Sequence, residues 1–253
     1  MTRADKLGRW LGAAAALAMT GCKPTPPSET RAPESGTNSI REIASLSAQI
    51  DTLLFADVIA DTTGHIVLPV GESSPFLEVL PEVFNAVVAE LNEETSPVRG
   101  LRRINEASRF FEDAIAIRLD AHPDFTCGYP KTADGKSQRS GYPDLVITHT
   151  HSGAVAYLDP KLFEQTGRDS SLRSFYYEPK GETGKIHHDA HHLLVGIAHD
   201  GNDGAWQFTG WDLVDLAKFR VKLKAEFQAS NRDIYREEFI VGKSVRRSPR
   251  EAP

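Results

Sequence analysis

Hydrophobic residues recur at helical spacing in the first half of the chain. Apolar side chains repeat every three or four residues over 40–60, over 76–91 and from about 98 to 119. The second stretch begins directly after Pro75 and the third ends shortly before Pro123, positions at which proline commonly borders a helix. The pattern therefore predicts three helices.

After residue 120 the pattern changes to that of strands. Residues 126–141 are rich in Gly, Lys, Ser and Pro and predict a loop. Residues 145–157 are apolar and β-branched on both sides of a Ser152-Gly153 turn signal, which predicts a β-hairpin. Residues 193–198 form an apolar run of strand length and predict a core strand. In the remaining segments, residues 174–177 predict a short strand, 189–192 a helical turn, and 211–226 fit either a helix or a strand.

The first 21 residues have the pattern of a secretion signal. Arg3, Lys6 and Arg9 precede a short apolar run over 10–19, about half of the roughly 20 residues that a membrane-spanning helix needs. Met19-Thr20-Gly21-Cys22 then resembles the lipobox of bacterial lipoproteins. This resemblance implies cleavage before Cys22 and a lipid anchor on that cysteine.

The signal determines the predicted organisation of the whole chain. Lys23 stands where lipoproteins retained in the inner membrane often have Asp, so the expected location is the bacterial cell envelope, at the outer membrane. The predicted segments are a lipoprotein signal peptide (1–21), a disordered tether (22–39), a helical N-terminal extension (40–97), the main domain (98–241) and a basic disordered tail (242–253).

Charge and cysteine content narrow the possible functions. The net charge is −6, and loss of the signal, with three positive charges and one negative, leaves −8. Bulk attraction to nucleic acid is therefore not expected, and DNA contact would need a local basic surface. Only Cys127 would accompany Cys22 in the mature chain, so no disulfide is expected within the domain. Candidates for the basic surface are Arg173, Lys185, Lys218, Arg220, Lys222 and Lys224, of which Arg173, Lys185, Lys222 and Lys224 are the predicted substrate contacts.

Charged residues lie at the two ends of the predicted hairpin. Pro143-Asp144 opens its first arm, and Asp159-Pro160-Lys161 closes the second. In an antiparallel hairpin, the residue numbers of two facing residues have a constant sum, which depends on where the turn is centred. If this sum is 303, Asp144 lies opposite Asp159; if it is 305, Asp144 lies opposite Lys161. In both registers the three charged side chains share one face, because side chains alternate along a strand. A loop with an odd number of residues would separate them.

Two close carboxylates repel each other unless a cation compensates their charge. Oxygen ligands favour Mg²⁺ or Mn²⁺ over zinc. A lysine beside such an ion can orient a water, and the two cations together can stabilise the charge that develops on a phosphodiester. The arrangement of Asp144, Asp159 and Lys161 therefore suits hydrolysis of phosphodiester bonds.

The same residues resemble the PD-(D/E)xK motif of the restriction-endonuclease-like nuclease superfamily, over roughly residues 100–230. Glu112, within Phe-Phe-Glu-Asp-Ala, resembles the glutamate that the superfamily carries on a preceding helix. The resemblance implies an α/β fold with a mixed central sheet flanked by helices, and Mg²⁺-dependent (or Mn²⁺-dependent) cleavage of DNA. It assigns Asp144 and Asp159 as metal ligands, Lys161 to orient the water, and Glu112 as an outer or second-metal ligand.

Alternative interpretations remain open at this point. Glu178-Pro179-Lys180 is a second Glu-x-Lys, and Pro160 is unusual near the end of a core strand. Residues 148–152 resemble the start of the metallo-β-lactamase motif, which would make the chain a zinc hydrolase, although Gly153-Ala154 departs from it. The zinc hydrolase would bind its metal with the histidines His187, His188, His191, His192 and His199. A further alternative is a non-catalytic lipoprotein that has a nuclease-like scaffold. The sequence does not determine the oligomeric state.

Overall fold

The computed structural model describes residues 34–242, except 51, 173, 225 and 227. The chain divides into two compact units between Ile43 and Ala44, and the second unit contains the sheet and the helices that cover it. The predicted signal peptide, Cys22 and the tail after residue 242 lie outside the described residues. Within the described part of the chain, no helix has the length and apolar character needed to span a membrane.

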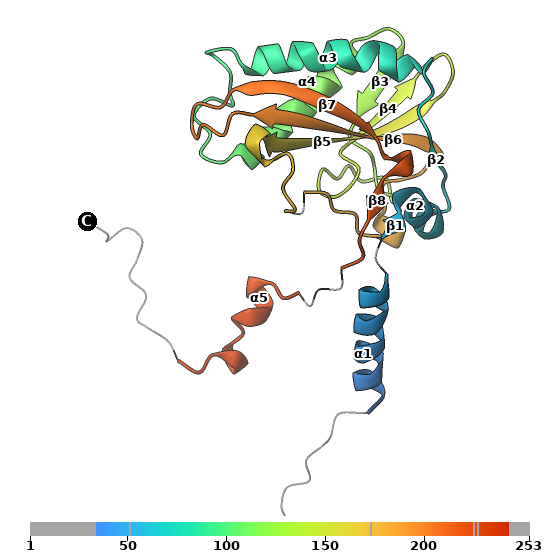
Figure 1. The fold of residues 1–253 in the computed structure, drawn as a ribbon, viewed down its shortest axis with the longest axis vertical. Coiled ribbons are helices and arrows are strands. Elements are labelled where there is room, and N and C mark those ends of the chain that lie inside the picture. Colours follow the sequence, from blue (N-terminus) through green and yellow to red (C-terminus); the bar gives the residue numbers. More distant parts are fainter. Residues whose placement is uncertain (1–33, 51, 173, 225, 227, 243–253) are drawn as a thin grey trace, which may run out of the picture. The chain divides into compact units, whose positions relative to one another are not determined.

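The second unit is built on a mixed six-stranded sheet (Figure 1). The strand order is β2-β6-β5-β4-β3, and β7 also pairs with β6. β5 runs parallel to β6, as does β2, whereas the β3-β4, β4-β5 and β6-β7 pairs are antiparallel. The strands are β2 (Val67–Leu68), β3 (Phe125–Gly128), β4 (Leu145–His149), β5 (Val155–Glu164), β6 (Ala190–His199) and β7 (Phe208–Asp215); β1 (Leu53–Leu54) and β8 (Arg220–Val221) form a separate antiparallel pair.

Helices lie on both faces of this sheet. α3 (Pro75–Leu91) and α4 (Ser108–Asp120) pack on one face, where Phe84 and Phe111 belong to the same buried cluster as Leu158. α2 (Phe55–Thr63) packs on the other face, in a cluster with Tyr157. Leu158 and Tyr157 are neighbours in β5 and point to opposite layers, as alternation along a strand requires. The predicted fold, a mixed sheet flanked by helices, is confirmed. The remaining helices are α1 (Glu34–Gln49) and α5 (Asn231–Ile234).

The N-terminal elements differ from the prediction. The helix expected over 40–60 is two helices, because Leu53–Leu54 pairs with β8 and interrupts the helical path. α1 begins at Glu34, inside the segment predicted to be a disordered tether. No domain boundary falls at residue 97, because β2 joins the central sheet and α3 packs against α4 and β7. Residues 44–97 therefore belong to the same compact unit as the predicted nuclease domain.

Several later elements also differ, because pairing between strands overrides local pattern. The third helix begins at Ser108, after a 3₁₀ turn, and the predicted loop over 126–141 starts with the end of β3. The predicted helical turn at 189–192 is the start of β6, where His191 pairs with Ala156 of β5. Residues 174–177 are not a strand. The ambiguous segment 211–226 contains the end of β7, a 3₁₀ turn at Leu216–Lys218 and the short strand β8.

Candidate active site

The hairpin formed by β4 and β5 positions the candidate catalytic residues. Leu145 pairs with Leu158, so paired positions sum to 303, and Asp144 stands at the position opposite Asp159. This is the first of the two predicted registers. Asp159 and Lys161 lie two residues apart on β5 and therefore project from the same face. β5 continues through Pro160 because only β6 pairs with it there; β4 begins at Leu145 and does not extend so far.

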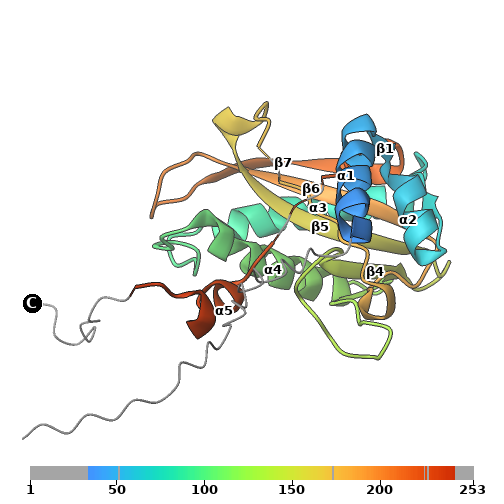
Figure 2. The same ribbon diagram turned by 90° about the horizontal axis from the view of Figure 1, so that it is seen from below.

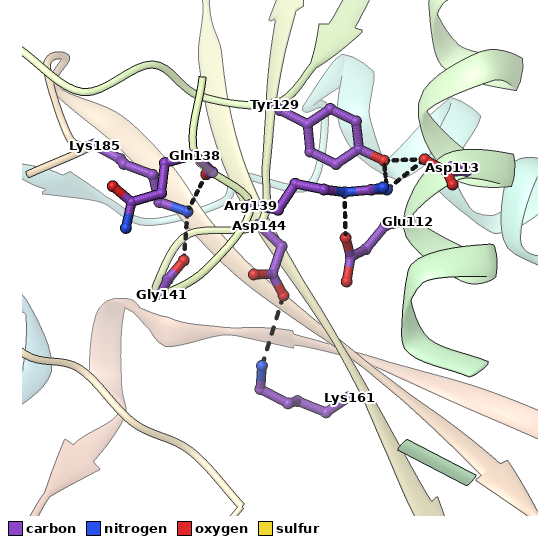
Figure 3. A network of polar contacts seen from close by, with 9 residues as sticks. All are labelled: Glu112, Asp113, Tyr129, Gln138, Arg139, Gly141, Asp144, Lys161 and Lys185. Atoms are coloured by element: carbon purple, nitrogen blue, oxygen red, sulfur yellow. Dashed lines mark hydrogen bonds and ion pairs between the residues drawn. The ribbon is translucent and has the colours of Figure 1, made fainter. Parts of the chain in front are cut away.

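The Lys161 ammonium lies between two carboxylates. Figure 3 shows its contact with one of them, that of Asp144. Its Nζ is 2.7 Å from Asp159 Oδ2 and 3.7 Å from Asp144 Oδ2. Asp159 is only 2% exposed, and its Oδ2 accepts no hydrogen bond of good geometry despite the nearby ammonium. Burial, followed by the neighbouring charge of Asp159, raises the pKa of Asp144 to about 8. The structure thus brings these three predicted residues together as a compact charged group.

Glu112 reaches the same site from α4. It occupies one turn of the helix with the buried residues Phe111 and Ile115, which fix the helix against the sheet. Burial raises the pKa of Glu112, and Arg139, Lys161 and Asp159 all act on it electrostatically. Its nearest ion-pair partner is Arg139, whose Nε lies 3.6 Å from Glu112 Oε2. Glu112 is therefore at the site but pairs with a different cation from the two aspartates.

Arg139 was not among the predicted site residues. It comes from the long loop between β3 and β4, which projects from the end of the sheet below β4 (Figure 2). Its guanidinium lies 4.2 Å from the centre of the Tyr129 ring and donates to the Tyr129 hydroxyl and to Asp113. Tyr129 also donates to Asp113. One indirect signal in the sequence is that this loop leads directly into Pro143-Asp144.

Lys185 is part of the interior and not of a basic surface. It is 4% exposed, and its ammonium donates to the carbonyls of Gln138, at 3.2 Å, and Gly141 (Figure 3). Burial lowers the pKa of Lys185. Its donors are turned inward onto backbone carbonyls, so Lys185 does not belong to an exposed basic surface, and its predicted contact with substrate stays a prediction.

The other predicted basic contacts do not form one strand. Arg173 lies outside the described residues. Only Arg220–Val221 of the segment 218–224 is a strand, so the basic residues of this segment do not share one strand face. Lys224 forms an ion pair with Glu226 at 2.8 Å, and Lys222 follows the strand.

The aspartate pair fits a hard divalent cation. Among the described residues, no three His, Cys, Asp or Glu side chains form a cluster that could enclose a metal ion on their own. Mg²⁺ does not require one, since it is commonly held by one or two carboxylates together with waters and substrate phosphate. The buried Asp159 oxygen without a hydrogen bond and the raised pKa of Asp144 both indicate a pair that a cation would stabilise.

The histidines of the zinc alternative are dispersed. His192 Nδ1 contacts the Tyr142 hydroxyl at 2.7 Å, His191 Nδ1 lies 3.0 Å from the Leu68 carbonyl, and His187 Nε2 lies 2.8 Å from the Lys131 carbonyl. Each of these three rings thus has its own partner in a different part of the unit. Over the residues that the structure describes, these rings do not assemble a zinc site.

Comparison with known proteins gives two matches that agree. Residues 48–238 match the model of the type II restriction enzyme MjaV family. The type II restriction enzyme MjaV of Methanocaldococcus jannaschii is 29% identical over 221 residues, an alignment that covers 79% of this chain and 94% of the relative. The matched region contains Glu112, Asp144, Asp159 and Lys161, and it also contains the elements from α2 to β8.

Proposed function

Because the chain belongs to the type II restriction enzyme MjaV family, we propose that it is an endonuclease that hydrolyses phosphodiester bonds of DNA with Mg²⁺ or Mn²⁺. The observation that carries this proposal is the position of the Lys161 ammonium, 2.7 Å from Asp159 and 3.7 Å from Asp144. Type II restriction enzymes generally need divalent metal ions, and the aspartate pair fits such an ion.

Each residue has a separate task in this proposal. Asp144 and Asp159 would hold the ion, which when bound supplies positive charge to the phosphodiester and its leaving oxygen. Lys161 is 32% exposed, so its ammonium can donate to the attacking water and orient it. Glu112 would serve as an outer ligand of this ion or as a ligand of a second ion.

Replacement of the aspartates tests the proposal. The purified protein should cleave duplex DNA with Mg²⁺ and lose this activity in EDTA. Asp144→Asn and Asp159→Asn should each lower the single-turnover cleavage rate by about 100-fold or more, the range seen when a group that stabilises transition-state charge is removed. Gel assays on plasmid and linear DNA measure both effects.

Glu78→Gln is the matched control, since Glu78 is an exposed carboxylate on α3. It should leave the cleavage rate unchanged. Cleavage that persists in EDTA, or full activity in Asp144→Asn, would contradict the proposal. A folded protein that binds DNA but cleaves none under any divalent ion would favour the non-catalytic scaffold.

The location of the protein is a further part of the proposal. We propose that Cys22 carries the lipid that anchors the chain in the bacterial cell envelope, at the outer membrane. The lipobox-like residues 19–22 support this, and the family match begins later, at residue 48. A nuclease placed there would meet incoming DNA and be kept from the cell's own chromosome.

A further inference from the structure

A cavity of about 400 Å³ opens beside the candidate active site. Three segments line it: the end of α2 near Thr62, the β3–β4 loop at Gln138–Tyr142, and residues 176–187 before β6. Asp144, Asp159, Lys161 and Glu112 do not line it, so it is a separate compartment from the acidic group. It is nevertheless adjacent, because Gly141 and Tyr142 in its wall directly precede Pro143-Asp144.

The lining of the cavity is cationic, although the chain as a whole has a net charge of −6. Lys180 and Lys185 contribute ammonium groups, and His65 and His187 add imidazoles. Among the side chains that the structure describes in this lining, Glu178 is the one carboxylate, and its side chain is 80% exposed. A concave site with this balance of charge selects an anion.

Both ammonium groups converge on one glycine. Lys185 donates to the carbonyl of Gly141, and Lys180 Nζ lies 3.4 Å from the place that a Cβ on Gly141 would occupy. Gly141 also has φ +81°, so a larger residue would be strained there and would crowd Lys180. Asp144 is three positions after Gly141 in the chain, a span of at most about 11 Å.

We propose that the cavity binds one backbone phosphate of the DNA strand, close to the phosphate that is cleaved, with Lys180 as its direct contact. This inference rests on the proposed function and names a subsite for the same substrate. Lys180 pairs only loosely with Glu178, at 3.8 Å, and a solvent-exposed pair of this kind is worth little. Lys180 can therefore exchange Glu178 for a phosphate oxygen at small cost.

The size of the cavity agrees with this ligand. Its volume is at the lower end of the roughly 300–1,000 Å³ typical of ligand pockets, so it can take one nucleotide of a strand but not a duplex. Lys185 forms the buried support, since it holds the Gln138–Gly141 turn in place. Burial lowers the pKa of Lys185. Because the Lys185 ammonium donates to two backbone carbonyls, Lys180 is the ammonium that contacts the anion directly.

Lys180→Gln tests the subsite, with Lys136→Gln as the control. Lys136 lies in the loop that contains Gly141, is 82% exposed, pairs with Asp134 and does not line the cavity. DNA binding is measured in EDTA at several salt concentrations. Lys180→Gln should weaken binding about tenfold and reduce the slope of log K against log salt by about 0.9, the value for one lost phosphate contact. Lys136→Gln should leave both unchanged.

A second measurement locates the phosphate. In a series of oligonucleotide duplexes, each duplex has a different single phosphate near the mapped cleavage position replaced by an uncharged methylphosphonate. In the wild-type protein, one position next to the cleaved phosphate should weaken binding about tenfold, and in Lys180→Gln the same substitution should have almost no further effect. Such non-additivity identifies a direct contact.

The outcomes separate the two proposals. If every methylphosphonate weakens DNA binding equally in the wild type and in Lys180→Gln, the subsite is overturned. The proposed function still stands in that case, provided that the wild type cleaves DNA. A wild-type protein that neither binds nor cleaves DNA would overturn the proposed function and the subsite with it.

Discussion

Two cations share the acidic residues of the site. Lys161 compensates Asp144 and Asp159 from within the sheet, and Arg139 compensates Glu112 from a loop. The two cations differ in how firmly they are held, because Lys161 lies on a strand paired along its length with β6, whereas Arg139 depends on its contacts with Tyr129 and Asp113. Lys161 is therefore the cation whose position is fixed for chemistry.

Replacement of Lys161 should affect catalysis more than binding. Lys161→Met removes the donor that would orient water and leaves Asp144 and Asp159 without their ammonium, so single-turnover cleavage should fall about 100-fold or more. DNA affinity in EDTA should change less than tenfold. Lys136→Met, the same change at an exposed position, serves as the control. A cleavage rate within threefold of wild type would rule out the proposed role of Lys161.

His192 should make stability depend on pH. Burial, with a smaller contribution from His191, lowers its pKa to about 4 from 6.5. Between these two values the unfolded chain binds a proton that the folded protein excludes. The stabilisation is therefore complete above pH 6.5 and is lost as the pH falls toward 4, by up to about 3 kcal/mol.

Urea unfolding at pH 7.5 and pH 5.0 measures this dependence. His192→Asn should lose much of the decline in stability between the two pH values, because no imidazole remains to be protonated on unfolding. His188→Asn, at an exposed histidine, should retain the decline. An equal pH dependence in wild type and His192→Asn would show that other groups cause it.

At the level of elements, the hydrophobic pattern predicted the helices and strands whose position depends on their own apolar face. α3 was expected over 76–91 and spans Pro75–Leu91, because its apolar stripe provides Phe76, Leu80 and Phe84 to the core. The hairpin and the shared face of Asp144, Asp159 and Lys161 were also predictable, since side chains alternate along a strand and both even registers place them together. The choice between Asp159 and Lys161 as the residue opposite Asp144 was left open by the sequence.

The parts that the sequence did not reveal depend on contacts between distant segments. The break in the helix expected over 40–60 comes from pairing with β8, more than 150 residues later in the chain. Arg139 and the inward orientation of Lys185 depend on how the β3–β4 loop folds back on the sheet, and no periodic pattern records this. The basic candidates of residues 218–224 do not share one long strand, because only Arg220–Val221 pairs with another strand, β1.

Two isoleucines of α4 provide a matched test of its packing. Ile115 is fully buried and Ile117 is 69% exposed on the same helix. Ile115→Ala should lower the free energy of unfolding by about 2–5 kcal/mol through lost burial and a cavity. Ile117→Ala should change it by less than about 0.5 kcal/mol. Chemical denaturation at neutral pH measures both, and similar losses would contradict the position of α4 described here.

At the scale of the whole molecule, the family match and the predicted anchor belong to different parts of the chain. Cys22 precedes the matched region 48–238. If the lipobox-like sequence is processed, radioactive palmitate should label the wild-type protein, which should sediment with membranes. Cys22→Ala should take up no label. Wild-type protein that stays full-length and unlabelled would refute the anchor while leaving the nuclease proposal untouched.

The register of the β4–β5 hairpin has a consequence for the history of the family. Asp144 and Asp159 stand opposite each other because the turn between the strands fits a sum of 303. A slip of one residue in the pairing of the two strands would put Asp144 on the opposite face from Asp159 and Lys161, whereas a slip of two residues would return them to one face. Among active relatives, changes in this hairpin should therefore keep the two aspartates on one face, and variants that separate them should have lost cleavage.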